Sequence, residues 1–137
     1  KGDVSYNSTV QRNHLKVIHQ SKTNTKANMK GIADTGSKLI YDKIQRNWTV
    51  AEANCVSKGG HLTSVSSPAD WKKLQAFVTM LGIKQDYIWL GGTKREGNWT
   101  WSDGREWSEE HWKGNYYAHP DKNCMFNYNG QWYDKQC

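Results

Sequence analysis

Three cysteines carry the most definite chemistry in this chain of 137 residues: Cys55, Cys124 and Cys137. An odd number of cysteines in a secreted protein implies disulfide pairing with one thiol left over. We therefore expect one disulfide and one unpaired cysteine, with the pairing left open by the count alone.

Three N-glycosylation triplets point to the same cellular setting. They begin at Asn7, Asn47 and Asn98, and each has threonine at its third position. Such triplets are glycosylated in surface loops of secreted proteins, and disulfides persist in oxidising compartments. The combination predicts an extracellular glycoprotein, either secreted or part of a larger ectodomain.

The histidines do not form a catalytic pattern. Five are scattered along the chain, and no nucleophile elbow, phosphate-binding loop or metal-triad spacing accompanies them. We therefore expect a binding protein rather than an enzyme, with no cofactor other than the calcium considered below.

The positive charge is concentrated at the N-terminal end. Residues 1–36 carry six basic and two acidic side chains, whereas residues 37–137 carry thirteen and eleven. We expect residues 1–36 to be a basic polar arm or linker, with at most a short helical turn, ahead of a domain formed by 37–137. The charge of the arm does not by itself support nucleic-acid binding, and no apolar run is long enough to span a membrane. Self-association through the arm is the alternative to a solvated tail.

The first elements of the domain follow from their end signals. Residues 38–42 predict a strand. Thr49, with Glu52 three residues later, predicts a capping box at the start of a helix. Gly59 and the glycine after it end this helix, and residues 62–65 alternate as in a short strand.

A second helix has the clearest start in the chain. Ser67 is a good N-cap, Pro68 suits the first helical position, and Gly82 ends the helix. Its apolar side chains recur at helical spacing and predict a face packed on the core, formed by Leu74, Phe77, Val78 and Leu81.

The remainder of the domain is mostly extended. Strands are predicted at 87–90, 98–102, 124–128 and 131–134, and the last two flank an Asn-Gly hairpin turn at Asn129. Residues 105–123 show no periodicity and predict a long irregular loop. Two helices followed by strands around a large loop indicate an α+β domain.

Four motifs in this pattern match a known family. Residues 48–64 contain W-x-x-A-x-x-x-C and then G-G-H-L-x-S, and residues 89–92 are similar to the central-strand motif W-I-G-L. Residues 99–104 contain W-x-W-S-D-G intact, and residues 124–137 hold a cysteine, W-x-D and a second cysteine. In this order, over about 38–137, the motifs resemble the C-type lectin-like domain.

The resemblance implies the fold and the disulfide pairing. The implied fold has two helices flanking small antiparallel sheets and a long irregular loop region. The implied inner bridge is Cys124–Cys137, whereas Cys55 would pair with a cysteine on a closing strand that lies beside the first strand. The sequence ends before such a strand, so the resemblance predicts a domain that is incomplete at its C-terminus and a full-length protein that continues and supplies a fourth cysteine. It also implies structural roles for His61, Trp107 and Trp112.

Sugar-binding members of this family hold a calcium ion between the long loop and the last hairpin. Calcium takes six to eight oxygen ligands from carboxylates, amides and carbonyls. In this chain the residues that would remain as weak candidate ligands are Asp121, Asn123 and Asp134.

Several departures weaken that calcium site. His119 stands where the family has Glu or Gln, Lys122 where it has an acid, and Tyr133 where it has Asn. Lys94 and Arg95 occupy the loop that carries acids at the auxiliary site. We therefore expect a recognition module that binds a glycan, protein or surface without the usual calcium-dependent sugar site.

Exposed aromatic side chains suit recognition because they supply contact area at low entropic cost. Two alternatives stay open: a calcium-dependent lectin with a rearranged loop, and a structural or assembly glycoprotein subunit. The candidate contact face consists of Tyr116, Tyr117, His119, Asp121, Asn123, Tyr133 and Asp134.

Overall fold

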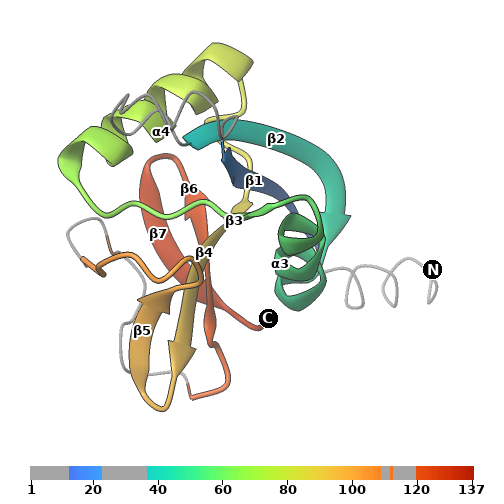
Figure 1. Ribbon diagram of the computed structural model, residues 1–137, viewed down its shortest axis with the longest axis vertical. Helices are drawn as coiled ribbons and strands as arrows, with labels where there is room; N and C mark the ends of the chain where they lie inside the picture. The colour runs from blue at the N-terminus through green and yellow to red at the C-terminus, as the bar shows by residue number, and fades with distance from the viewer. Residues whose placement is uncertain (1–12, 23–36, 109–111, 113–119) are drawn as a thin grey trace.

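The computed structural model of this chain describes residues 13–22, 37–108, 112 and 120–137. Two helices pack against a mixed sheet of seven strands, as predicted for an α+β domain (Figure 1). The strands run in the order β2-β1-β4-β6-β7, with β3 paired to β1 and β5 paired to β4. The resemblance had implied antiparallel sheets. The β1–β4 pair departs from that expectation because it is parallel.

The first strand lies inside the segment that we expected to be an arm. β1 (Leu15–Lys22) pairs along its length with β2 (Ser37–Arg46) and also contacts β3 and β4. Val17 and Ile18 are fully buried on opposite faces of the strand. The expectation of a linker with at most a helical turn is therefore wrong for residues 15–22, because side chains on both faces of this polar-looking strand are buried in the two core clusters.

The position of β1 bears on the expected closing strand. Beside β2, where the resemblance placed that strand, the sheet holds β1. β1 carries no cysteine, and Cys55 is a buried free thiol, as expected for this sequence.

Helix α3 (Trp48–Ser57) begins two residues earlier than predicted. Its N-cap is Asn47, whose Oδ1 accepts a hydrogen bond from Val50 N at 2.9 Å. The predicted capping box between Thr49 and Glu52 is therefore wrong. Glu52 lies within the helix and points instead to β3 (Gly60–Leu62), where its carboxylate accepts a bond from Leu62 N at 3.0 Å.

Helix α4 (Pro68–Leu81) has the predicted boundaries. Ser67 Oγ accepts a hydrogen bond from Asp70 N at 3.1 Å, and Gly82 ends the helix with a left-handed φ of 70°. Leu74 and Val78 are buried on the sheet, whereas Leu81 is 42% exposed and lies outside the core face expected for it.

The remaining strands carry the site. β4 (Ile88–Arg95) is the central strand, and β5 (Asn98–Trp101), β6 (Cys124–Tyr128) and β7 (Gln131–Lys135) follow. The β6–β7 turn has left-handed φ values at Asn129 and Gly130, as expected for an Asn-Gly hairpin. Of the expected loop at 105–123, residues 109–111 and 113–119 lie outside the described residues.

Tryptophans fill the core on the α4 side of the sheet. Trp101 meets Trp132 edge to face at 5.4 Å between ring centroids and lies 4.6 Å from Trp107. Trp112 lies 4.7 Å from Trp99 and bridges to β7. The structural roles expected for Trp107 and Trp112 agree with these contacts, since both pack against the buried cluster.

Cys124 and Cys137 form the expected disulfide, with their Cα atoms 5.2 Å apart. Next to this bridge, Trp48 N donates to the carbonyl of Cys137 at 2.8 Å. The end of the hairpin is thereby attached to the first turn of α3.

Candidate functional site

The predicted contact face is described in part. Tyr116, Tyr117 and His119 lie outside the described residues. The structure places Asp121 and Asn123 just before β6, and Tyr133 and Asp134 on the neighbouring strand β7. We call these last four residues the loop–hairpin end.

Polar contacts already engage two groups of the loop–hairpin end. Asp121 Oδ2 accepts a hydrogen bond from Gln136 Nε2 at 3.1 Å. The carbonyl of Asn123 accepts bonds from Lys94 N at 2.8 Å and from Thr93 Oγ1 at 2.9 Å. These bonds fix the chain on either side of Lys122 and leave the side chain of Asn123 available to a ligand.

The described residues fit a calcium ion poorly. Among them, no group of three or more His, Cys, Asp and Glu side chains is placed to hold a metal ion. Lys122 follows Asp121 directly, and Lys94 lies across the strand pair with its ammonium 5.8 Å from the ring centroid of Trp99. Cations beside so few carboxylates oppose the binding of a divalent cation.

A hollow of about 450 Å³ opens beside the loop–hairpin end. Glu96 and Gly97 form the tight turn between β4 and β5, with φ values of 51° and 83°. Glu96 is therefore a non-glycine residue in the left-handed region, a conformation that β-hairpin turns of this kind require. The β4–β5 hairpin supplies an ammonium and a carboxylate to this hollow, and the segment before β6 supplies an amide. The lining consists of Lys94, Glu96, Gly97, Pro120 and Asn123.

Tyr133 packs on the sheet and is not part of the lining of this hollow. Its ring stacks on Phe126 with centroids 5.5 Å apart and planes inclined by 24°. Phe126 in turn stacks on Tyr87 at 5.0 Å and 16°, and Tyr87 meets Tyr128 edge to face at 4.8 Å. A row of rings therefore runs across the sheet from Tyr133 to the start of β4.

A second hollow, of about 230 Å³, lies where this row ends. It could not be predicted from the sequence because its residues come from three segments, one of which belongs to the strand expected to be a linker. An aromatic residue directly before a buried strand was the only sequence signal. We call it the sheet-end hollow, and its polar and aromatic lining consists of His14, Lys16, Gln45, Gln85, Asp86 and Tyr87.

A half-buried ion pair between Lys16 and Asp86 lines the sheet-end hollow. Asp86 Oδ2 accepts bonds from Lys16 Nζ and from Tyr41 Oη, both at 3.3 Å. The hydrogen bond with Asp86 raises the pKa of Lys16, and burial raises the pKa of Tyr41. Lys16 is therefore charged and Tyr41 neutral throughout the physiological range.

Two of the three predicted glycosylation residues are described. Asn98 is exposed at the start of β5, and Asn47 is half-buried because its side chain caps α3. Asn7 lies outside the described residues.

His61, expected to be structural, pairs with Glu52. In the described part of the chain, no helix is both long enough and apolar enough to cross a bilayer.

Comparisons with known proteins agree with these elements. Residues 44–137 match the family model for the lectin C-type domain. Among curated relatives, the galactose-specific lectin nattectin of Thalassophryne nattereri is 31% identical over 96 residues, covering 68% of this chain and 58% of that protein. The human C-type lectin domain family 4 member F is 42% identical over 71 residues, covering 50% of this chain and 11% of that protein. The chain thus spans only part of the length of these relatives.

A solved structure gives the same result for the fold. The mouse scavenger receptor C-type lectin carbohydrate-recognition domain matches with a TM-score of 0.52 and 27% sequence identity, covering 66% of this chain and 71% of that one. The family consists of binding proteins rather than enzymes, in agreement with the absence of a catalytic pattern from the sequence. The chain therefore belongs to the C-type lectin domain family.

Proposed function

We propose that this chain is an extracellular glycan-recognition module whose loop–hairpin end binds sugar hydroxyls directly, without a bound calcium ion. The observation that carries the proposal is the contact of Asp121 with Gln136, at 3.1 Å, beside the cation Lys122. A carboxylate that is held by an amide and flanked by an ammonium is a poor starting point for a calcium shell.

The hollow beside this end has the groups that direct sugar binding needs. Lys94 donates hydrogen bonds, Glu96 accepts them, and the amide of Asn123 does both. Sugar hydroxyls also donate and accept, so a small set of fixed polar groups can orient one sugar ring.

The relatives support glycan recognition as the ligand class. Nattectin is named as galactose-specific, and the matching mouse domain is named as a carbohydrate-recognition domain. The disulfide supports an extracellular location, because such bonds persist in oxidising compartments. Type-2 ice-structuring proteins are also among the relatives, at 32% identity over 76 residues for that of Hemitripterus americanus.

The test is glycan binding with and without calcium. The protein is applied to a printed panel of galactose-, mannose-, fucose- and N-acetylglucosamine-terminated glycans in millimolar Ca²⁺ and then in excess EDTA. We expect the same glycans to bind in both buffers. We also expect no rise in melting temperature on adding Ca²⁺, because a ligand that binds only the folded state would raise it.

A matched pair of variants locates the binding. Glu96→Gln keeps the turn but removes the charge of the acceptor, and it should weaken glycan binding. Met80→Ala truncates an exposed side chain on α4 and should leave binding unchanged. Binding that disappears in EDTA would instead favour the calcium-dependent lectin with a rearranged loop. Binding to no glycan on the panel would contradict the proposal.

A further inference from the structure

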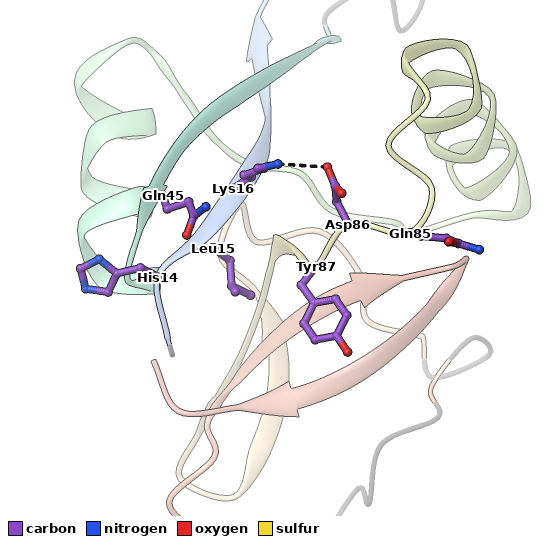
Figure 2. Close-up of a pocket in the computed structure, with 7 residues that line it drawn as sticks. All are labelled: His14, Leu15, Lys16, Gln45, Gln85, Asp86 and Tyr87. Carbon is purple, nitrogen blue, oxygen red and sulfur yellow. Dashed lines mark hydrogen bonds and ion pairs between the residues drawn. The ribbon is translucent and has the colours of Figure 1, made fainter. Parts of the chain in front are cut away.

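We propose that the sheet-end hollow is a second saccharide-binding site, in which the exposed ring of Tyr87 stacks on one face of a neutral sugar. This site goes beyond the function proposed above, because it lies at the start of β4 and uses none of the residues of the loop–hairpin end. Figure 2 shows Asp86 and Tyr87 in the segment directly before β4, with the Asp86 carboxylate pointing to Lys16 and the Tyr87 ring pointing the other way, and with His14 and Gln45 across from them.

The ring of Tyr87 is both exposed and fixed. The residue is 51% exposed, which is unusual for a large aromatic residue next to a buried strand. Its position is held by the stacking contact with Phe126 at 5.0 Å and the edge contact with Tyr128 at 4.8 Å. A ring that is already held by neighbours loses little conformational entropy on binding, so its contact area is well suited to recognition.

The rim of the hollow supplies hydrogen-bonding groups that can exchange with water. Gln45 and Gln85 are exposed, and each amide can donate and accept. Asp86 uses its Oδ2 atom for both Lys16 and Tyr41, which leaves the Oδ1 atom as an acceptor for a ligand. The lining also includes His14 on the opposite side, although its ring points away from Tyr87 (Figure 2).

The charge of the hollow selects the class of ligand. The carboxylate of Asp86 is neutralised by Lys16 at 3.3 Å, so the described lining offers no net charge to an ionic ligand. An aromatic face, two amides and one free carboxylate oxygen favour a molecule with both an apolar face and several hydroxyl groups. A neutral pyranose has this combination, and a hollow of about 230 Å³ accommodates one ring rather than an extended chain.

The test uses NMR of the ¹⁵N-labelled chain in EDTA, with methyl galactoside, methyl mannoside and methyl N-acetylglucosaminide as separate probes. We expect at least one of these sugars, at millimolar concentration, to shift the backbone amide signals of Gln85, Tyr87 and Gln45. EDTA excludes any contribution from calcium. Shifts confined to the residues around Asn123 and Glu96 would support the loop–hairpin site and overturn this one.

Three variants test whether the sugar binds at the sheet-end hollow. Tyr87→Ala should weaken binding at the sheet-end hollow at least tenfold, and Gln85→Ala should weaken it by a smaller factor while leaving the packing of β4 intact. Met80→Ala, on α4, serves as the matched control for truncation of an exposed side chain. Binding that is equal in Gln85→Ala, Tyr87→Ala and the control overturns the proposal, as does the absence of shifts at residues 85–87 with all three sugars.

Discussion

Glu52 Oε2 and His61 Nδ1 lie 2.5 Å apart and join α3 to β3. The other carboxylate oxygen of Glu52 accepts bonds from Leu62 N and from Ser102 Oγ, each at 3.0 Å. The side chain of Glu52 is only 16% exposed. One carboxylate thus connects a helix, a strand and the residue that follows β5.

We predict that Glu52→Ala destabilises the domain by about 3 kcal/mol, because it leaves the Leu62 amide and the Ser102 hydroxyl without their acceptor. Urea unfolding followed by tryptophan fluorescence measures this change. Glu52→Gln keeps one oxygen for both donors and should cost less than half as much. Equal losses in the two variants would mean that the charge, rather than the acceptor, is what matters.

Gly91→Ala should destabilise the central strand by about 2–3 kcal/mol, because a new methyl group has no room there. A Cβ atom at Gly91 would lie 2.8 Å from both the carbonyl oxygen of Leu62 and Ser102 Oγ. Gly59→Ala is the control, since nothing lies within 4 Å of its Cβ position and only its left-handed φ of 85° is unfavourable. That variant should lose about 1 kcal/mol, and a larger loss there than at Gly91 would contradict the steric argument.

His19 should make stability depend on pH in the mildly acidic range. Burial, reinforced by Lys58, lowers the pKa of His19 below its ordinary value of 6.5. The unfolded chain therefore takes up a proton before the folded one does, so the stabilising effect is present above pH 6.5 and is lost as the pH falls. In His19→Leu, the urea concentration at the unfolding midpoint should fall less between pH 7 and pH 5 than it does in the unchanged protein. An unchanged slope in that variant would assign the effect to another group.

Cys55 should show the opposite dependence at high pH. Burial raises the pKa of its thiol from 9.0 to about 12, so stability should fall as the pH rises from 9 towards 12. At pH 8 the native protein should resist iodoacetamide, because the thiolate is the reactive form. Mass spectrometry should detect one alkylated residue only after urea is added, and rapid labelling of the folded protein would show that the thiol is accessible.

The sequence was sufficient where local signals and the final packing agree. Ser67, Pro68 and Gly82 set the ends of α4 through hydrogen bonds and backbone angles within a few residues, and the Asn-Gly turn at Asn129 fixes the β6–β7 register in the same way. These features can be predicted because their causes lie close together in the chain.

The features that the sequence missed depend on distant partners. β1 looked like a polar arm because its buried side chains make sense only once β2, β3 and β4 surround it. Glu52 had the spacing of a capping residue, but its partners lie up to 50 residues away. The sheet-end hollow combines parts of β1 and β2 with the residues before β4, so no single stretch of the sequence could indicate it.

The Cys124–Cys137 disulfide should contribute about 3 kcal/mol, as expected for a closed loop of this length. It holds the hairpin end against α3, where Trp48 N donates to the carbonyl of Cys137 at 2.8 Å, and it flanks the strand that carries Tyr133 and Asp134. The double variant Cys124→Ala/Cys137→Ala should therefore lose stability and also weaken glycan binding at the loop–hairpin end, whereas shifts at Tyr87 should persist wherever the protein remains folded. Urea titrations compared with those of Cys55→Ala, which removes a cysteine but no bridge, separate the loss of the bond from the loss of a sulfur atom. Equal unfolding midpoints for these two variants would show that the bond adds no stability beyond the packing of its sulfur atoms.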